Sequence, residues 1–433
     1  MKKSLFALAA VTAFAGAAQA QSSVTVYGLM DIGVGGYGSR AAGVTSTTVG
    51  GGQAGGGVNK TTGTVAIDGA ESTNRLGFKG TEDLGGGASA FFTIELGLNP
   101  DSQSTLSTAS SNSTENRQTF VGLKKNGLGD LALGTQYTTV YNAVAKTDAG
   151  NTNNLTGDLI YTAGKGSGVY PQGNAAGDSF TIRANQMITL NSETYAGFQA
   201  HAMAILNNNN STQSTTTSGS STTVVGGINN QNGWGLGLDY TWNKLFLTAN
   251  YQGLTAKNPS VTVTNPSGLI TSQPSGAPVP FGAVQSSQLG TNVQDNQFYV
   301  GGTYDFGILK AYAQYVTRKV MLQQDNNQYA KRSAEQIGIR SFITPTIEGW
   351  VSGGLGRVTG NGGTFATGYA QPTANLTAWQ IGSNYWLSKR TNLYAIYGQS
   401  NTSNVSNVST AGANGNPVSG NINNYAVGVR HTF

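Results

Sequence analysis

The chain of 433 residues contains no cysteine. This absence excludes disulfide bonds, thiolate chemistry and cysteine ligands for a metal. Histidine is nearly absent too, because His201 and His431 are the only two in the chain. Charged residues make up only 10% of the sequence, and the formal net charge falls by two, from +5 to +3, without Lys2 and Lys3. Such a weak basic balance does not indicate a nucleic-acid partner.

Long hydrophobic runs are missing after residue 20, so the mature sequence predicts no membrane-spanning helix. Residues 1–20 have a basic start, a short apolar stretch and the small-residue ending Ala18-Gln19-Ala20. This pattern predicts a secretory signal peptide, with the mature chain starting near Gln21. The alternative, a transmembrane helix, fits less well because the apolar stretch is short and no stop-transfer flank follows it.

Aromatic residues and glycine are abundant, with 19 Tyr, 15 Phe and 62 Gly. The aromatic residues recur among Val, Leu and Ile in segments that alternate between apolar and polar positions, and this alternation is typical of β-strands. Sixteen such segments have roughly the ten residues that a tilted membrane strand needs. They lie at 24–34, 72–80, 88–98, 115–125, 131–141, 179–192, 196–206, 232–242, 244–254, 297–306, 308–319, 333–343, 346–358, 376–386, 391–400 and 423–433.

The connections between these segments alternate in length, as in an outer-membrane barrel with short turns on one rim and long loops on the other. All ten prolines fall in the connections or at their edges, as expected for a residue that cannot donate to a β-ladder. A secreted β-helix or adhesin is the alternative, but a β-helix would show a short fixed repeat and none is present. The sequence predicts no helix.

The last strand has two distinct faces. Tyr425, Val427, Val429 and Phe433 share one side, and Asn424, Ala426, Gly428, Arg430 and Thr432 share the other. One face suits an apolar surround and the other suits water, which is the pattern of a membrane-spanning strand.

Four stretches resemble the general porins of Gram-negative bacteria, of the Neisseria, Bordetella, Burkholderia and Comamonas type. They are SSVTVYGLMDIGV, NRLGFKGTEDLGGG, NRQTFVGLKKNGLGDLALGTQYT and YAVGVRHTF. The resemblance implies an all-β fold over residues 21–433, a transmembrane 16-stranded antiparallel β-barrel with an inward-folded constriction loop. It further implies a homotrimer in the cell outer membrane, in contact with lipid and lipopolysaccharide, that passes small hydrophilic solutes and anions by passive diffusion without a cofactor. The terminal Phe433 resembles the family's signal to the barrel-assembly machinery.

A connection of about forty residues, 141–180, separates the fifth and sixth predicted strands. Its length exceeds that of a normal hairpin and suggests a structural role. By the resemblance it is the loop that folds into the barrel and narrows it, whereas the alternative is an external loop. The similarly long segment 256–293 contains five prolines and no acidic residue, so we assign it to the extracellular face.

Charged side chains on the inner face should determine which solutes and ions pass through the expected lumen. Strand alternation turns a set of basic residues inward, and the long connection offers Asp148 and Asp158 as counter-charges across the lumen. For each single base the alternative is a position at the rim. The predicted basic set is Arg75, Lys79, Arg117, Arg183, Lys310, Arg318, Arg340 and Arg430; the orientation of Arg117 is ambiguous because Phe120 and Val121 are both apolar.

Thr135 occupies the place where the family's fifth-strand motif usually has an arginine between Gly and Gln. The lost charge predicts an anion preference that is only modest.

The other function classes are an outer-membrane enzyme, an adhesin and a substrate-specific channel. The sequence disfavours an enzyme, since His431 faces outward and no acid or nucleophile can be assigned to His201 from sequence.

Overall fold

A computed structural model describes residues 23–45, 56–100, 108–110, 113–162, 179–218, 221–258, 261–264, 291–323, 326–327, 329–361, 373–406 and 417–433. The predicted signal peptide, residues 1–20, lies outside these described residues. In the described part no helix has the length and apolar character needed to cross a membrane.

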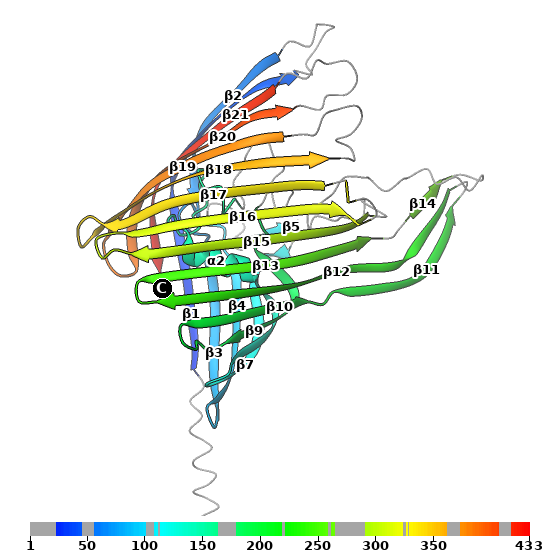
Figure 1. Ribbon diagram of the computed structural model, residues 1–433, viewed down its shortest axis with the longest axis horizontal. Helices are drawn as coiled ribbons and strands as arrows, with labels where there is room; N and C mark the ends of the chain where they lie inside the picture. The colour runs from blue at the N-terminus through cyan, green and yellow to red at the C-terminus, as the bar shows by residue number, and fades with distance from the viewer. Residues whose placement is uncertain are drawn as a thin grey trace, which may run out of the picture.

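Sixteen strands form a closed ring in which every strand is antiparallel to both neighbours (Figure 1). The predicted barrel is therefore confirmed. The ring consists of β1 (Ser23–Thr45), β3 (Arg75–Gly85), β4 (Ala88–Gly97), β7 (Asn116–Lys125), β8 (Gly129–Tyr137), β9 (Arg183–Ser192), β10 (Phe198–Ile205), β12 (Ser221–Trp242), β13 (Leu245–Asn258), β15 (Thr291–Asp305), β16 (Lys310–Leu322), β17 (Tyr329–Phe342), β18 (Ile347–Asn361), β19 (Thr373–Trp386), β20 (Thr391–Ser406) and β21 (Pro417–Thr432).

Five further strands accompany the ring within the described residues. β2 (Gly56–Asp68) continues the ladder on β1, while β11 (Asn208–Ser218) and β14 (Val261–Thr264) pair with the far half of β12. β5 (Thr108–Ser110) and β6 (Ser113–Thr114) form a separate two-stranded sheet. Figure 1 shows β11, β12 and β14 projecting beyond the ring at the right. Strands such as β1, with 23 residues, are longer than the roughly ten residues predicted for each strand. The extra length comes from hairpins that continue past the ring.

Alternation places apolar side chains outside and polar ones inside. On β15, Phe298 and Val300 are 38% and 40% exposed, whereas the intervening Gln297 and Tyr299 are fully buried. In hydrocarbon each unpaired backbone N–H or C=O costs several kcal/mol, so a closed ladder with an apolar exterior is the arrangement that strands can adopt there.

The ends of the chain close the ring. The amide and carbonyl of Phe433 both hydrogen-bond Gly28, at 3.1 Å each. The phenyl ring covers this position, because a Cβ atom built on Gly28 would lie 2.2 Å from the Cζ atom of Phe433. Glycine at position 28 therefore leaves room for the terminal aromatic ring, and the ladder between β21 and β1 closes the ring of strands.

The second strand of the barrel is interrupted. Residues 69–74 leave the ladder between β2 and β3, and Ala70, Glu71 and Asn74 in this short segment are nearly fully buried. The sequence predicts a continuous strand from residue 72 and misses this inward excursion.

Replacing Phe433 by alanine tests the closure. The backbone bonds to Gly28 remain possible, but the ring contact is lost, and we expect the free energy of unfolding to drop by about 1–3 kcal/mol, below the range for a fully buried phenylalanine. Urea unfolding of the barrel in lipid vesicles measures this change. Phe342→Ala, at an exposed ring near a short turn, is the matched control, and an equal effect of both variants would contradict a closing role for Phe433.

Candidate functional site

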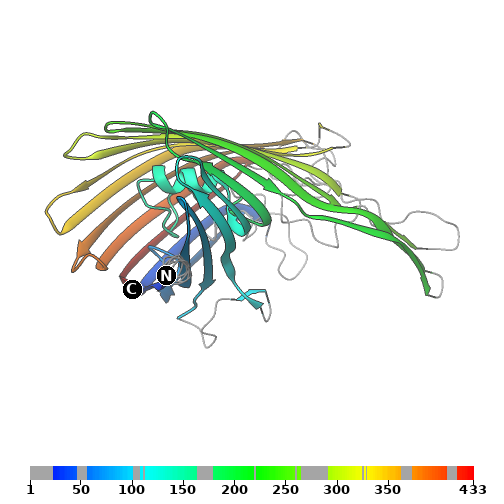
Figure 2. The ribbon, with the colours of Figure 1, turned by 90° about the horizontal axis from the view of Figure 1, so that it is seen from below.

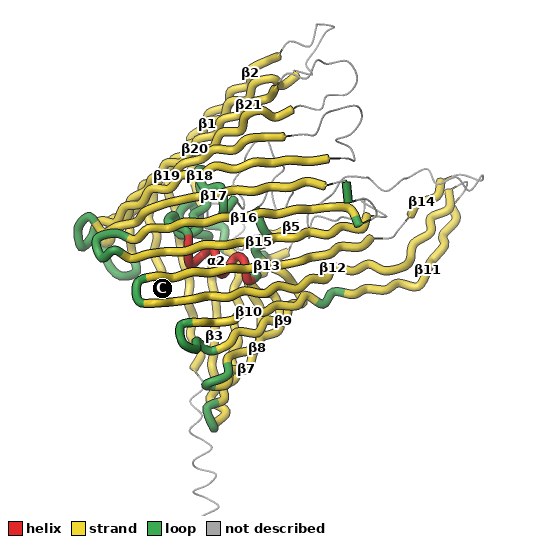
Figure 3. Tube along the Cα trace, viewed as in Figure 1, coloured by secondary structure: helices red, strands yellow, loops and turns green. Residues whose placement is uncertain are grey.

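The connection after β8 enters the ring as a short helix. Helix α2 (Thr139–Thr147) begins after Thr138, whose hydroxyl caps it by accepting a hydrogen bond from the amide of Tyr141 at 3.3 Å. Its buried residues recur at helical spacing, and α2 contacts β10, β12, β13, β15 and β16. Figures 2 and 3 show the helix enclosed by the strands. The absence of a helix was therefore a wrong prediction.

An apolar cluster fixes this segment to the inner face of the wall. Val140 and Val144 of α2, with Leu159 and Ile160 further along, pack against inward-facing residues of four strands. The wall residues of the cluster are Tyr299, Val316, Ala334, Leu376 and Ala378. Burial of such side chains contributes roughly 1.5–3 kcal/mol each. The segment is thus packed against β15, β16, β17 and β19 as a fixed part of the barrel.

Hydrogen bonds extend the attachment to β19 and β20. The side-chain amides of Asn153 and Gln380 bond each other in both directions, at 2.5 and 2.9 Å. The hydroxyls of Thr156 and Ser400 are 3.2 Å apart. Gly398 allows this approach, because a Cβ atom there would lie 1.7 Å from the Thr156 carbonyl oxygen.

The interrupted second strand meets the same segment. Asn154 donates from its amide to the Ala70 carbonyl at 2.9 Å and from its side chain to the Gly69 carbonyl at 2.7 Å. Leu155 packs in one cluster with Ala70, Trp350, Tyr394, Ile396 and Ala426. The two inward excursions, 69–74 and 138–162, therefore support each other inside the ring.

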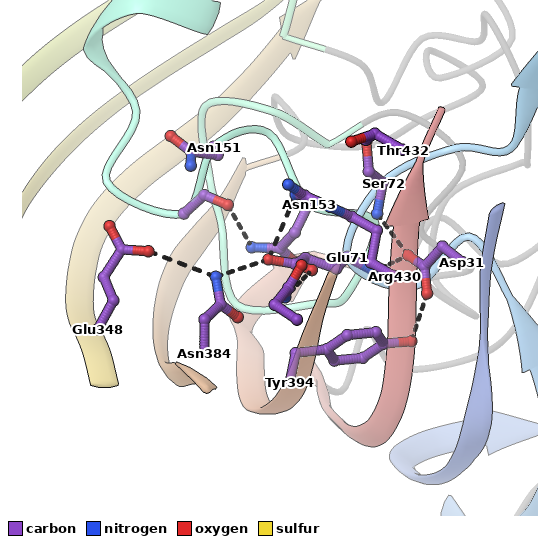
Figure 4. Close-up of polar contacts among 12 residues, drawn as sticks. Asp31, Glu71, Ser72, Asn151, Asn153, Glu348, Asn384, Tyr394, Arg430 and Thr432 are labelled. Carbon is purple, nitrogen blue, oxygen red and sulfur yellow. Dashed lines mark hydrogen bonds and ion pairs between the residues drawn. The ribbon is translucent and has the colours of Figure 1, made fainter. Parts of the chain in front are cut away.

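Residues 69–74 are themselves held to the wall by the carboxylates of Asp31 and Glu71. Asp31 of β1 accepts hydrogen bonds from the amides of Glu71 and Ser72 at 2.7 Å and from the Tyr394 hydroxyl at 2.6 Å (Figure 4). The Glu71 carboxylate accepts from Asn384 and Asn392 at 2.8 and 2.9 Å. Neither acid is among the site residues predicted from the sequence.

Most of the predicted basic residues lie in the interior in ion pairs with acids. Four of the predicted arginines have a partner within 3 Å and a fifth within 4 Å. The pairs are Arg117–Glu95 at 2.8 Å, Arg183–Glu115 at 2.8 Å, Arg318–Asp295 at 2.5 Å, Arg340–Glu348 at 2.9 Å and Arg430–Glu71 at 3.5 Å. The pairs of Arg117, Arg318 and Arg340 are buried. Removing one partner of a buried pair is strongly destabilising, so these three arginines contribute to the structure as well as to the interior electric field.

Three of the predicted basic residues have weaker pairing with acids than the five arginines above. Arg75 donates to the Ser72 hydroxyl at 3.0 Å and stays 4.0 Å from Glu95. Lys79 lies 5.4 Å from the centre of the Tyr27 ring, and Lys310 lies 5.3 Å from that of Tyr312. Among the described residues, these cations on β3 and β16 are the predicted ones with the weakest acidic pairing.

Tyrosines line the space beside Arg117. Tyr137 accepts a hydrogen bond from Arg117 at 2.9 Å and stacks on Tyr141 of α2, with ring centres 4.2 Å apart. Burial raises the pKa of Tyr141 to about 12, so this side chain is neutral at pH 7.

Asp148 and Asp158 do not face a basic wall across open space, as the sequence analysis expects. They are 1% and 3% exposed. Asp148 accepts from the Thr152 amide, and Asp158 accepts from the amides of Ile160 and Tyr161 at 2.7 and 2.9 Å. Both carboxylates form turns in the inward segment, as Asp side chains often do.

A bulge changes the orientation predicted in β9. Gln186 has a φ of 53°, and the pairing of β8 with β9 shifts at this point. Ala184 therefore packs in an interior cluster with Met187 and Met203, although strand alternation predicts that it faces out. The strand alternation that predicts an inward Arg183 therefore does not hold across this bulge.

Thr135 shares its face with the exposed Leu131 and Leu133, and its hydroxyl bonds the exposed Asn185 at 3.2 Å. The neighbour Gln136 is the buried, inward residue. Because this position faces outward, the absence of the family's arginine removes no positive charge from the interior. The register shift lies in β9 and does not turn Thr135 inward.

His201 does have an acidic partner, which the sequence analysis could not assign. Its Nε2 atom is 3.2 Å from Asp239, and the same carboxylate binds Lys146 of α2 at 2.6 Å and the Thr248 hydroxyl at 2.6 Å. Asp239 thereby anchors α2 to β12. His431 is exposed and bonds Thr391 at 2.8 Å.

A closed antiparallel barrel with an apolar exterior and a largely polar interior defines the class of transmembrane β-barrels. The family described as Gram-negative porin matches residues 7–405, and the chain belongs to this family. It is accordingly an outer-membrane protein.

Curated relatives agree with this family. The chain is 30% identical over 203 residues to an outer membrane porin protein of Bordetella pertussis. This matched region covers 46% of each chain. It is 34% identical over 206 residues to outer membrane porin protein 32 of Delftia acidovorans, covering 46% of this chain and 48% of the relative. The chain thus spans about half the length of the curated relatives it matches.

Solved structures share the fold. The anion-selective porin from Comamonas acidovorans superposes with a TM-score of 0.58 at 19% identity, over 95% of this chain and 100% of that one. OmpT of Vibrio cholerae, in a trimer form, gives 0.52 at 14% identity over 95% and 99%.

Proposed function

We propose that the protein forms a water-filled channel for passive diffusion of small hydrophilic solutes. The observation that carries this proposal is the attachment of residues 138–162 to the inner faces of β12–β20 by an apolar cluster and side-chain hydrogen bonds. A sixteen-stranded barrel has an aqueous interior, and a segment fixed on one side of it narrows the passage to the opposite side. The expected constriction over 141–180 is supported by its described residues, 141–162 and 179–180.

We propose a modest preference for anions. Arg75, Lys79 and Lys310 have weak or no acidic pairing in the described residues, whereas the other predicted arginines are each paired. A unit charge about 4 Å from an ion contributes roughly 1 to 4 kcal/mol between bulk-water and protein-surface dielectrics. The porin from Comamonas acidovorans that shares this fold is described as anion-selective, which agrees with the proposed preference. Physiological salt screens these charges beyond about 8 Å.

We further propose a homotrimer, with Phe433 read by the barrel-assembly machinery and lipopolysaccharide around the barrel. Catalysis is not part of the proposal, because the acid beside His201 is occupied by Lys146 and Thr248. The alternative functions are an adhesin or a substrate-specific channel, and a folded protein without diffusive conductance would favour the adhesin.

Deleting about residues 150–172 tests the constriction. Loops tolerate such changes better than strands, so we expect a folded barrel with a larger single-channel conductance. Planar-bilayer recording measures this conductance, and heat modifiability on gels verifies folding. A folded deletion with the wild-type conductance would place the constriction elsewhere.

Salt-gradient reversal potentials test the charge assignment. We expect Arg75→Ala and Lys79→Ala to shift the potential towards cations, and more so at low salt because screening is weaker. Thr135→Arg is the matched control: since Thr135 lies on the outward face, this added arginine should shift the potential much less than either deletion. A wild-type channel with strong cation selectivity at low salt would contradict the proposed preference.

A further inference from the structure

Three half-buried tyrosines lie in the interior, on the side of the barrel that the inward segment leaves free. Tyr27 belongs to β1, Tyr137 ends β8, and Tyr141 belongs to α2. Because residues 138–162 are attached to β12–β20, the proposed passage runs along the strands from β1 to β9. The three rings therefore lie beside this passage, and we call them the tyrosine patch.

A continuous chain of contacts holds the tyrosine patch in place. The Tyr27 hydroxyl donates to Glu95 at 3.1 Å, and Arg117 donates to the same carboxylate at 2.8 Å. Arg117 also donates to the Tyr137 hydroxyl at 2.9 Å, and Tyr137 stacks on Tyr141 with ring centres 4.2 Å apart. Glu95 and Arg117 are nearly fully buried and pair with each other. The rings are thus held before any solute arrives, which reduces the cost of ordering them on binding.

Two weakly paired cations lie beside the tyrosine patch. The Arg75 side chain is 24% exposed and stays 4.0 Å from Glu95. The exposed Lys79 lies 5.4 Å from the centre of the Tyr27 ring. Burial raises the pKa of Tyr141 to about 12, and Arg75 opposes this rise, so the guanidinium is close enough to act on this ring. Positive charge and aromatic rings therefore occur together on this part of the inner face.

This combination fits a planar aromatic anion. A solute ring can extend a stacked pair by offset or edge-to-face packing, and a carboxylate matches the fork of a guanidinium. The Glu95 carboxylate is occupied by Arg117 and Tyr27, so Arg75 can accept a second acid as partner. A saturated ring of equal charge would gain the contact with the cation but not the stacking.

We propose that the tyrosine patch, together with Arg75 and Lys79, binds single-ring aromatic carboxylates of the benzoate class as they pass. The carboxylate contacts the cations, and the ring packs on Tyr137 and Tyr141. This inference rests on the proposed channel function and names the class of solute that the channel prefers.

The test compares benzoate with cyclohexanecarboxylate, which has the same charge and a similar size but no aromatic ring. Wild-type channels in a planar bilayer carry a chloride current at pH 7, and each anion in turn is added until it halves this current. We expect benzoate to do so at a concentration roughly twofold to tenfold lower, because an aromatic pair adds a stacking contribution. Arg75→Ala should weaken both anions similarly, since both carry the carboxylate.

Variants of the ring pair separate stacking from charge. Tyr137→Leu with Tyr141→Leu should bring the two half-blocking concentrations together, whereas Tyr137→Phe with Tyr141→Phe keeps the rings and should keep the preference for benzoate. Tyr397→Leu is the matched control. It removes a tyrosine that also packs on another ring, that of Trp379 with centres 5.2 Å apart, but on the outward face opposite the exposed Ile381. This control should behave as the wild type does.

The wild-type comparison decides the proposal even where a variant does not fold. Equal half-blocking concentrations of the two anions in a channel that conducts chloride would overturn it, and so would an unchanged preference for benzoate in a folded double leucine variant. A folded wild-type barrel, verified by heat modifiability, that carries no chloride current would contradict the proposed channel itself.

Discussion

The need to pair every backbone N–H and C=O group in hydrocarbon determines the rest of this structure. A chain of strands meets this need only by closing on itself, so β1 must pair with β21 and the terminal Phe433 must fit over Gly28. Closure in turn separates an outer face, which contacts lipid, from an inner face, which is shielded from it. Side chains that would be costly outside, such as Asp31, Glu71 and Arg318, are therefore collected inside, where they can pair.

Two inward excursions pack inside this closed ring. Residues 138–162 pack against the wall. Residues 69–74 contact this longer segment at Asn154 and Leu155. The attachment uses apolar contacts around Val144, amide pairs such as Asn153–Gln380 and the ion pair Lys146–Asp239. Because these interactions belong to different strands, the segment is fixed along its described length. The interior charges that could steer ions are consequently few, since many are used to hold the structure together.

The ring of strands could be predicted from the sequence because alternation over ten residues is a strong and local signal. The site could be predicted only in part. The bulge at Gln186 reverses the orientation expected for Ala184, and a bulge leaves no clear mark in one sequence. The acids Glu95, Asp295 and Glu348 that pair with the predicted arginines lie on the neighbouring strands, and which inward side chains meet there depends on the exact strand register. A usable signal was present in β16 and β19, where Val316 and Leu376 are apolar on the inner face and mark the wall that the loop covers.

The most direct test of the account is a disulfide between the inward segment and the wall. The chain has no cysteine, and the hydroxyls of Thr156 and Ser400 are 3.2 Å apart, so Thr156→Cys with Ser400→Cys replaces two neighbouring oxygens by sulfurs. The account predicts that this disulfide forms on mild oxidation of the folded barrel, with a single-channel conductance equal to that of the reduced protein. A folded double variant that stays reduced, or a conductance that falls when the bond forms, would contradict the position of the segment against β20.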